Sequence, residues 1–241
     1  SPTLAVSDSR SANLQGVSPQ ITPVETKARQ AISDLPTHRS VGDITIPQQC
    51  TPDTSYKLPS SVDLSDKSEG LHIVQDRTSF YRVYGNTLDQ IRQQMRTCAP
   101  ATGGTDAQSE FAAETSYNLS SQYSWTADEA GVCHVSSVKV GLHINMVLPK
   151  WQSPVNADDS LTITWGNYTN HLRTHENGHA AIDKSYASKL LNDLKNFPST
   201  DCSSIADKLK SKAKADISAL DSANNVYDAS TNHGATQGAT F

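Results

Sequence analysis

The chain contains 241 residues, with 20 Lys and Arg against 25 Asp and Glu, so its formal net charge is −5. This acidic balance argues against a nucleic-acid partner, which would require a basic face. No run of apolar residues approaches the roughly 18–20 that cross a membrane, so we expect no membrane-spanning segment.

The chain begins Ser1-Pro2-Thr3, without Met and without the basic and apolar regions of a signal peptide. We interpret this start as that of a mature chain from which a signal peptide has been removed. The four cysteines are widely spaced: Cys50, Cys98, Cys133 and Cys202. This pattern suits two disulfides in an oxidising compartment and predicts a secreted or periplasmic protein. Four buried free thiols in a cytosolic protein are the alternative.

Residues 1–70 hold seven of the eleven prolines and show no sustained helical or strand period. We interpret them as a polar N-terminal extension or a prosegment. Residues 71–241 are then expected to form the folded domain.

Three segments are expected to form strands: 71–84, as two short strands or one bent strand, 111–126, and 138–148. The clearest is 138–148, in which apolar residues recur at every second position until Pro149 ends the pattern. A short helix is expected over 88–96, because Thr87 can cap its N-terminus.

Two longer helices are expected to follow. The first has an apolar stripe that runs from a cap at Ser160 to a stop at Pro198. The second follows a cap at Ser199 or Thr200 and keeps its stripe to Ala223. Together these elements predict an α+β fold, in which an antiparallel sheet packs on a long helix that forms a helical hairpin with the next helix.

The first long helix carries His175-Glu176-Asn177-Gly178-His179, an H-E-x-x-H motif. Positions i and i+4 share one helix face, so the imidazoles of His175 and His179 can bind one Zn²⁺. Glu176 lies beside the metal in this arrangement and is the predicted general base for a zinc-activated water. The alternative is a pair of buried histidines packed in the core.

A catalytic zinc site usually takes a third protein ligand. His171 lies eight residues from His179, and Asp183 lies eight from His175, which is about 12 Å along a helix and too far to share an ion. Asp183 is therefore expected either to hydrogen-bond His179 or to face solvent.

The second helix of the hairpin returns to the level of the motif near residues 218–222, so the residues that follow are expected to lie near the two histidines. We predict His233 as the third ligand, with a stray histidine in a mobile tail as the alternative. Tyr227 is predicted to donate a hydrogen bond to an oxyanion, or else to pack on the core. Asp228 is expected to orient a ligand imidazole or to cap the loop.

At these residues the sequence resembles a bacterial family described as predicted secreted zinc-dependent proteases. The resemblance covers roughly residues 80–238 and rests on the following stretches: Tyr81-Arg-Val-Tyr-Gly-Asn-Thr87, Cys133, Leu148-Pro-Lys-Trp151, Trp165, the H-E-x-x-H motif, Cys202 and Tyr227-Asp-Ala-Ser-Thr-Asn-His-Gly-Ala-Thr-Gln-Gly238. It implies a metallopeptidase-like domain with zinc. The family's cysteines match Cys133 and Cys202, which suggests that these two form one disulfide and that Cys50 and Cys98 form a second.

The sequence therefore predicts a secreted zinc metalloendopeptidase that acts as a monomer on a protein or peptide substrate. Three alternatives remain open. The chain could be a non-catalytic zinc-binding or adhesion module, or a zinc amidase acting on cell-wall peptides. It could also be an inactive precursor in which residues 1–70 cover the cleft.

Overall fold

A computed structural model describes residues 61–99 and 112–241, apart from the side chains of residues 74–76. Its elements in chain order are β1 (Gly70–Val83), α1 (Leu88–Cys98), β2 (Glu114–Ala127), β3 (Val132–Trp151), α2 (Asp159–Lys195), β4 (Thr200–Asp201), α3 (Ile205–Thr231) and a short 3-10 helix (Ala235–Gln237). Residues 1–60, most of the predicted extension, lie outside the described residues.

The sheet is mixed, and the expectation of an antiparallel sheet is wrong. Strand β3 is central, pairing with β2 and with the short β4 in antiparallel fashion and with β1 in parallel fashion. The β1 register runs from Gly70 opposite Lys139 to Val83 opposite Trp151. A period-2 pattern identifies a strand and its buried face, but it carries no information about the direction of the neighbouring strand. Because α1 separates β1 from β2, no tight hairpin dictates that direction either.

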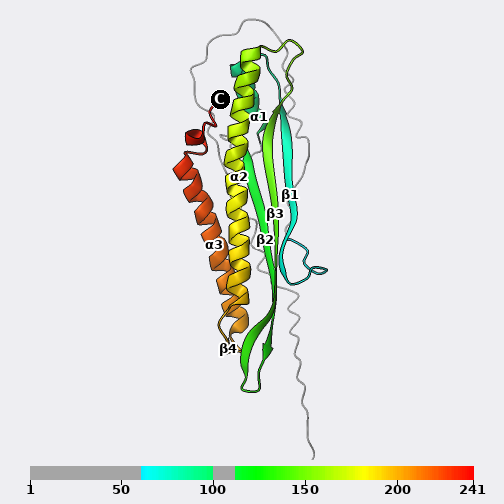
Figure 1. Cartoon of the computed structure of the whole chain (residues 1–241), viewed down its shortest axis with the longest axis vertical. Coiled ribbons are helices and arrows are strands. Elements are labelled where there is room, and N and C mark those ends of the chain that lie inside the picture. The colour runs from blue at the N-terminus through cyan, green and yellow to red at the C-terminus, as the bar shows by residue number, and fades with distance from the viewer. Residues whose placement is uncertain (1–60, 100–111) are drawn as a thin grey trace, which may run out of the picture.

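The predicted helical hairpin is confirmed. Helices α2 and α3 lie side by side along one face of the sheet (Figure 1), and α2 contacts β3 and α3 most extensively. The alternating residues of β3 face these helices and are fully buried: Val138, Val140, Leu142 and Ile144. They pack with the buried stripes of both helices, including Leu190 and Leu209. Burial of these apolar surfaces is the main force that holds the hairpin on the sheet.

Several boundaries differ from the sequence expectations. Asp158 rather than Ser160 caps α2, since its carboxylate accepts a hydrogen bond from the Leu161 amide at 3.0 Å. Strand β3 continues through Pro149, which lies beyond the point where β2 pairing begins at Glu114 opposite Val147. Proline has no backbone N–H group to donate, and it is tolerated there because β2 offers no carbonyl oxygen opposite this position.

Helix α3 also begins later and ends later than expected. Residues Thr200–Asp201 pair with β3 as β4, so the helix starts after Ser204. It then continues to Thr231, which makes Tyr227 and Asp228 helical residues instead of members of a tail.

The described residues before β1 pack on the sheet face opposite the helices. Val62 and Leu64 are buried, and the Val62 amide donates to the Ser120 hydroxyl at 2.9 Å. A Cβ at Gly141 would lie 2.5 Å from the Val62 side chain, so this approach requires glycine.

The Cys133–Cys202 disulfide is present and joins β3 to the segment that leads into α3. Cys98 is also disulfide-bonded, whereas its expected partner Cys50 lies outside the described residues. Within the described ranges, no helix combines the length and apolarity that crossing a bilayer would require.

We expect removal of the Cys133–Cys202 bridge to destabilise the domain. The two cysteines are 69 residues apart, so the bridge restricts a long loop in the unfolded chain, and its loss should cost about 2–4 kcal/mol. The test is urea denaturation of the Cys133→Ala/Cys202→Ala double variant without reductant, which leaves the Cys98 bridge intact. A change below about 1 kcal/mol would contradict this expectation.

Candidate metal centre

The candidate centre lies between one face of α2 and one face of α3, and polar residues recur every four residues on both faces. On α2, His175, His179 and Asp183 follow one another at intervals of four residues, and on α3 Asn224 and Asp228 do the same. Residues four apart lie on one face of a helix. Because the helices run antiparallel, Asp228 faces the two histidines, and Asn224 lies between His179 and Asp183.

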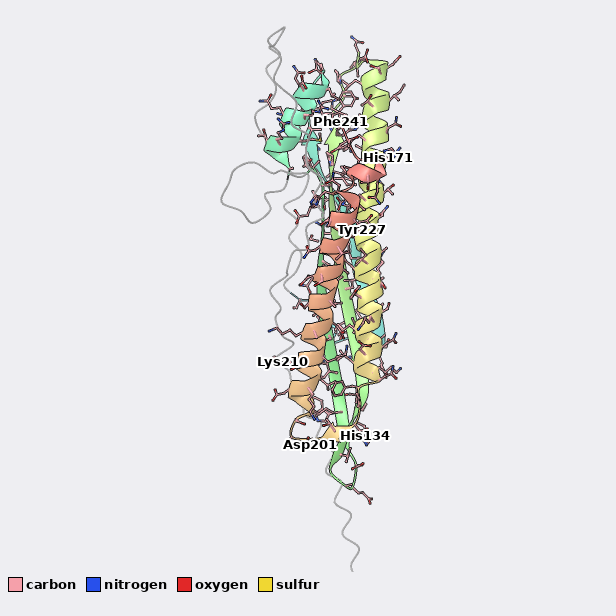
Figure 2. The ribbon with its side chains drawn as sticks, turned by 90° about the vertical axis from the view of Figure 1, so that its left-hand side faces the viewer. His134, His171, Asp201, Lys210, Tyr227 and Phe241 are labelled. Carbon is pink, nitrogen blue, oxygen red and sulfur yellow. A yellow bond between two sulfur atoms is a disulfide. The ribbon has the colours of Figure 1, made fainter. Side chains whose placement is uncertain are left out.

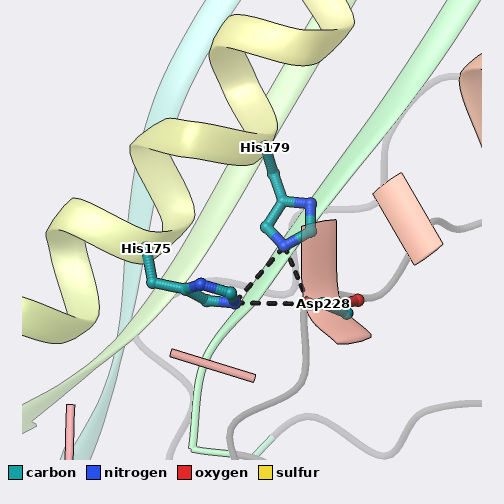
Figure 3. A group of neighbouring side chains, drawn as sticks. All are labelled: His175, His179 and Asp228. Atoms are coloured by element: carbon teal, nitrogen blue, oxygen red, sulfur yellow. Dashed lines mark hydrogen bonds and ion pairs between the residues drawn. The ribbon is translucent and has the colours of Figure 1, made fainter. Parts of the chain in front are cut away.

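Three possible metal-ligating atoms converge at this point (Figure 3). The Nε2 atoms of His175 and His179 are 3.3 Å apart. Oδ1 of Asp228 lies 3.3 Å from the first and 3.0 Å from the second. Burial raises the pKa of Asp228, whereas hydrogen bonds and charge interactions with His175 and His179, which require hydrogen on Nε2, lower it by more.

The site is enclosed by protein. His175 and Glu176 are 0% exposed, His179 is 1% exposed and Asp228 is 5% exposed. Charged and polar groups at this depth are costly unless they are paired or bind an ion. In this arrangement Asp228 is paired with both imidazoles, and the same atoms could bind an ion.

Glu176 extends from the same helix turn toward the sheet. Its Oε2 accepts a hydrogen bond from the Thr115 hydroxyl on β2 at 2.7 Å. Its Oε1 is buried and has no hydrogen-bond partner among the described residues. Burial, partly offset by the Thr115 hydrogen bond and reinforced by the charges of Asp228 and Glu114, raises the pKa of Glu176 well above its usual range. A nearby divalent cation would act in the opposite direction.

The residues after α3 fold back over α2 and bring Gln237 to the site. Asn232 and Gly234 adopt positive φ angles, and Gly238 does so again, where a Cβ would meet the His171 ring at 2.5 Å. Gln237 Oε1 then lies 2.9 Å from Nδ1 of His175.

Arg92 of α1 anchors this segment further along, through a 2.7 Å hydrogen bond from Nε to the Phe241 carbonyl oxygen. In Figure 2, Tyr227, His171 and Phe241 lie toward the α1 end, far from His134 and Asp201.

Tyr227, the predicted oxyanion donor, packs directly on the two histidines. Its ring stacks on that of His175, with centroids 5.1 Å apart, and meets that of His179 edge-on at 4.8 Å. Its hydroxyl donates to the His175 carbonyl oxygen at 3.3 Å and accepts from Gln237 Nε2 at 3.0 Å. These contacts match the alternative in which Tyr227 packs on the core. Its role as a hydrogen-bond donor to an oxyanion stays a prediction.

The structure puts Asp228 in the position that we predicted for His233. His233 lies at the rim, and its Nδ1 is 3.6 Å from Asp228 Oδ1 and thus outside the group of converging atoms.

His171 is also outside this group, with Nδ1 2.9 Å from the Gly238 carbonyl oxygen. Asp183 reaches His179 only through Asn224, which donates to its Oδ1 at 3.0 Å. Burial raises the pKa of Asp183 to about 7.

Sequence reasoning missed Asp228 as a candidate ligand because it treated residues after 226 as non-helical. The signal that could have found it is the four-residue spacing between Asn224 and Asp228, which mirrors the spacing of the two histidines. Two imidazoles with one carboxylate form a donor set that catalytic zinc sites use. The converging acceptors and the buried Glu176 oxygen fit a divalent cation.

We expect Asp228, and not His233, to govern metal affinity. Asp228→Ala removes a converging oxygen and should weaken zinc binding by about 100-fold or more, whereas His233→Ala should change it by less than about 10-fold. Competition with a chromophoric chelator measures both constants. The reverse order of effects would restore His233 as the ligand.

Gly178 is expected to tolerate no side chain, because a Cβ there would lie 2.0 Å from the Tyr227 hydroxyl and 2.3 Å from its ring carbon Cζ. Gly178→Ala should therefore destabilise the protein by about 1–3 kcal/mol, despite the better helix propensity of alanine. Gly166→Ala in the same helix is the matched control, since a Cβ there meets nothing within 4 Å. It should stabilise by about 0.5–1 kcal/mol in the same denaturation assay, and equal stabilisation by both variants would refute the clash.

The site lies within a region that a known family model covers. The family is described as "Bacterial protein of unknown function (DUF922)", and its model matches residues 78–234, which is more than half of the chain. This span includes the two histidines, Glu176 and Asp228. No curated protein and no solved structure matches the chain. The protein belongs to the DUF922 family of bacterial proteins.

Proposed function

We propose that this protein is a zinc-dependent peptidase in which His175, His179 and Asp228 hold the metal and Glu176 is the general base. The observation that carries the proposal is the convergence of the three ligating atoms within 4.8 Å of one another. Three protein ligands leave a fourth position open for water or substrate, which is typical of catalytic zinc sites, whereas structural sites are closed by four. A zinc ion bound there would supply Lewis acidity, which polarises a carbonyl group and makes water more acidic.

Glu176 has the properties that the general base requires. The Thr115 hydroxyl holds Oε2, so Oε1 is the oxygen that can accept a proton from water and pass it to a leaving amine. Burial raises the pKa of Glu176 well above its usual range, and a divalent cation bound nearby would lower it, so the carboxylate could accept a proton and later release it.

Burial of the centre favours a second candidate, in which the metal has no catalytic role. An ion enclosed by His175, His179 and Asp228 would join α2 to α3 and stabilise the hairpin, as structural zinc does in small domains. In that case zinc content would approach one per chain, and no protein or peptidoglycan peptide would be cleaved.

We expect Glu176→Gln to abolish cleavage of a denatured protein while zinc content stays near one per chain. Glutamine keeps the shape and the Thr115 contact but cannot act as a base at neutral pH, so the loss should be at least about 100-fold in rate. The measurements are peptide release and metal analysis on the same preparations.

His175→Ala is the matched control, because it should lose both zinc and cleavage. Undiminished cleavage by Glu176→Gln would sink the general-base assignment. Zinc uptake without any cleavage by the wild-type protein would select the second candidate.

A further inference from the structure

Both imidazoles at the centre have a second contact on the side away from Asp228, and in each case it is the carbonyl oxygen of a primary amide. His179 Nδ1 lies 2.7 Å from Asn224 Oδ1, and His175 Nδ1 lies 2.9 Å from Gln237 Oε1. Neither amide is a member of the H-E-x-x-H motif. The Thr231 hydroxyl is a longer contact of His175 Nδ1, at 3.5 Å.

The orientation of the Asn224 amide follows from its other neighbour. Its Nδ2 donates to Oδ1 of the buried Asp183 at 3.0 Å. Burial raises the pKa of Asp183 to about 7, and above that pH its carboxylate only accepts hydrogen bonds, so the NH₂ group of Asn224 must then face Asp183. Its carbonyl oxygen therefore faces His179. We call Asp183, Asn224 and His179 the Asn224 relay.

The orientation of the Gln237 amide follows by the same logic. The Tyr227 hydroxyl has two possible acceptors, the His175 backbone carbonyl oxygen at 3.3 Å and Gln237 Oε1 at 3.4 Å. When it donates to the His175 carbonyl oxygen, its own oxygen is free to accept from Gln237 Nε2 at 3.0 Å. The amide carbonyl of Gln237 consequently faces His175. We call Tyr227, Gln237 and His175 the Gln237 relay.

Each relay offers an acceptor to an Nδ1 atom, which requires a hydrogen on that nitrogen. In a neutral imidazole the hydrogen on Nδ1 leaves a lone pair on Nε2. The two lone pairs then meet 3.3 Å apart, beside a carboxylate oxygen at 3.0 and 3.3 Å. Three acceptors with no hydrogen between them repel one another, and a cation removes that repulsion.

We propose that Asn224 and Gln237 are positioning residues that hold His179 and His175 with hydrogen on Nδ1 and thereby set the affinity for zinc. The proposal rests on the metal site of the proposed function and is independent of whether a peptide is cleaved. Asn224 is the more informative position, because Asp183 fixes its orientation and both residues are buried.

The test is a set of Asn224 variants whose zinc affinity is measured by chelator competition. Asn224→Leu removes the acceptor and should weaken binding by about 10–100-fold. Asn224→Asp places a second carboxylate against Asp183 and should also weaken zinc binding. The exchange Asp183→Asn/Asn224→Asp restores one donor and one acceptor between the two positions and still offers an oxygen to His179, so affinity should return to within about threefold of wild type.

Tyr117→Phe is the matched control, because it removes a 2.6 Å hydrogen bond to Asp221, one turn before Asn224 on α3, and Tyr117 is a member of neither relay. It should leave zinc affinity within about threefold of wild type. Equal losses in Tyr117→Phe and Asn224→Leu would assign the effect to docking of α3 and overturn the proposal. Unchanged affinity in a folded Asn224→Leu protein, or an exchange variant no better than Asn224→Asp, would overturn it as well.

A second readout needs no metal. In nitrogen-15 spectra of the zinc-free chain at about pH 8, His175 and His179 should carry hydrogen on Nδ1. The His179 signal should change in Asn224→Leu. If both histidines of the wild type carry hydrogen on Nε2 alone, the proposed hydrogen bonds from Nδ1 to Asn224 and Gln237 are refuted. Failure of the wild-type chain to take up zinc would instead overturn the proposed function, and these spectra would still decide whether the relays exist.

Discussion

The organisation of this protein depends on the meeting of two imidazole nitrogens and a carboxylate oxygen between α2 and α3. All three groups are buried, and their mutual distances of 3.0–3.3 Å leave no room for water between them. Such a cluster is electrostatically unfavourable unless positive charge lies at its centre. When both imidazoles carry their hydrogen on Nδ1, the hairpin brings together three acceptors whose repulsion a cation removes.

The rest of the fold holds this cluster in place. The apolar stripes of α2 and α3 pack on β3, and the Cys133–Cys202 bridge closes the end of the hairpin farthest from the site. Beyond α3, the turn at Gly234 and the anchoring of Phe241 by Arg92 return Gln237 to His175. Strand β2 supplies Thr115, which holds Glu176. Several separate elements thus position one turn of α2, which is how a preorganised site is built.

One residue of the H-E-N-G-H stretch, Gly178, has its identity set by a neighbour distant in sequence. Gly178 has no side chain because the Tyr227 ring occupies the space beside it. Asn177 has no such constraint from the contacts described above. The spacing of the motif is local, whereas the identity of the residue at its fourth position depends on packing between α2 and α3.

The sequence by itself determined the features that depend on local periodicity and spacing. These are the long strand over 138–148, the two long helices, their hairpin, and the pair of histidines on one face of α2. Only the tertiary structure decided that β1 runs parallel to β3, because strand direction depends on the path of the chain around α1 and not on any local pattern. It also decided that Asp228 completes the cluster and that His233 lies beside it, since this outcome depends on α3 continuing to Thr231. Helix length at that end is stabilised by packing against α2, which a single sequence does not reveal.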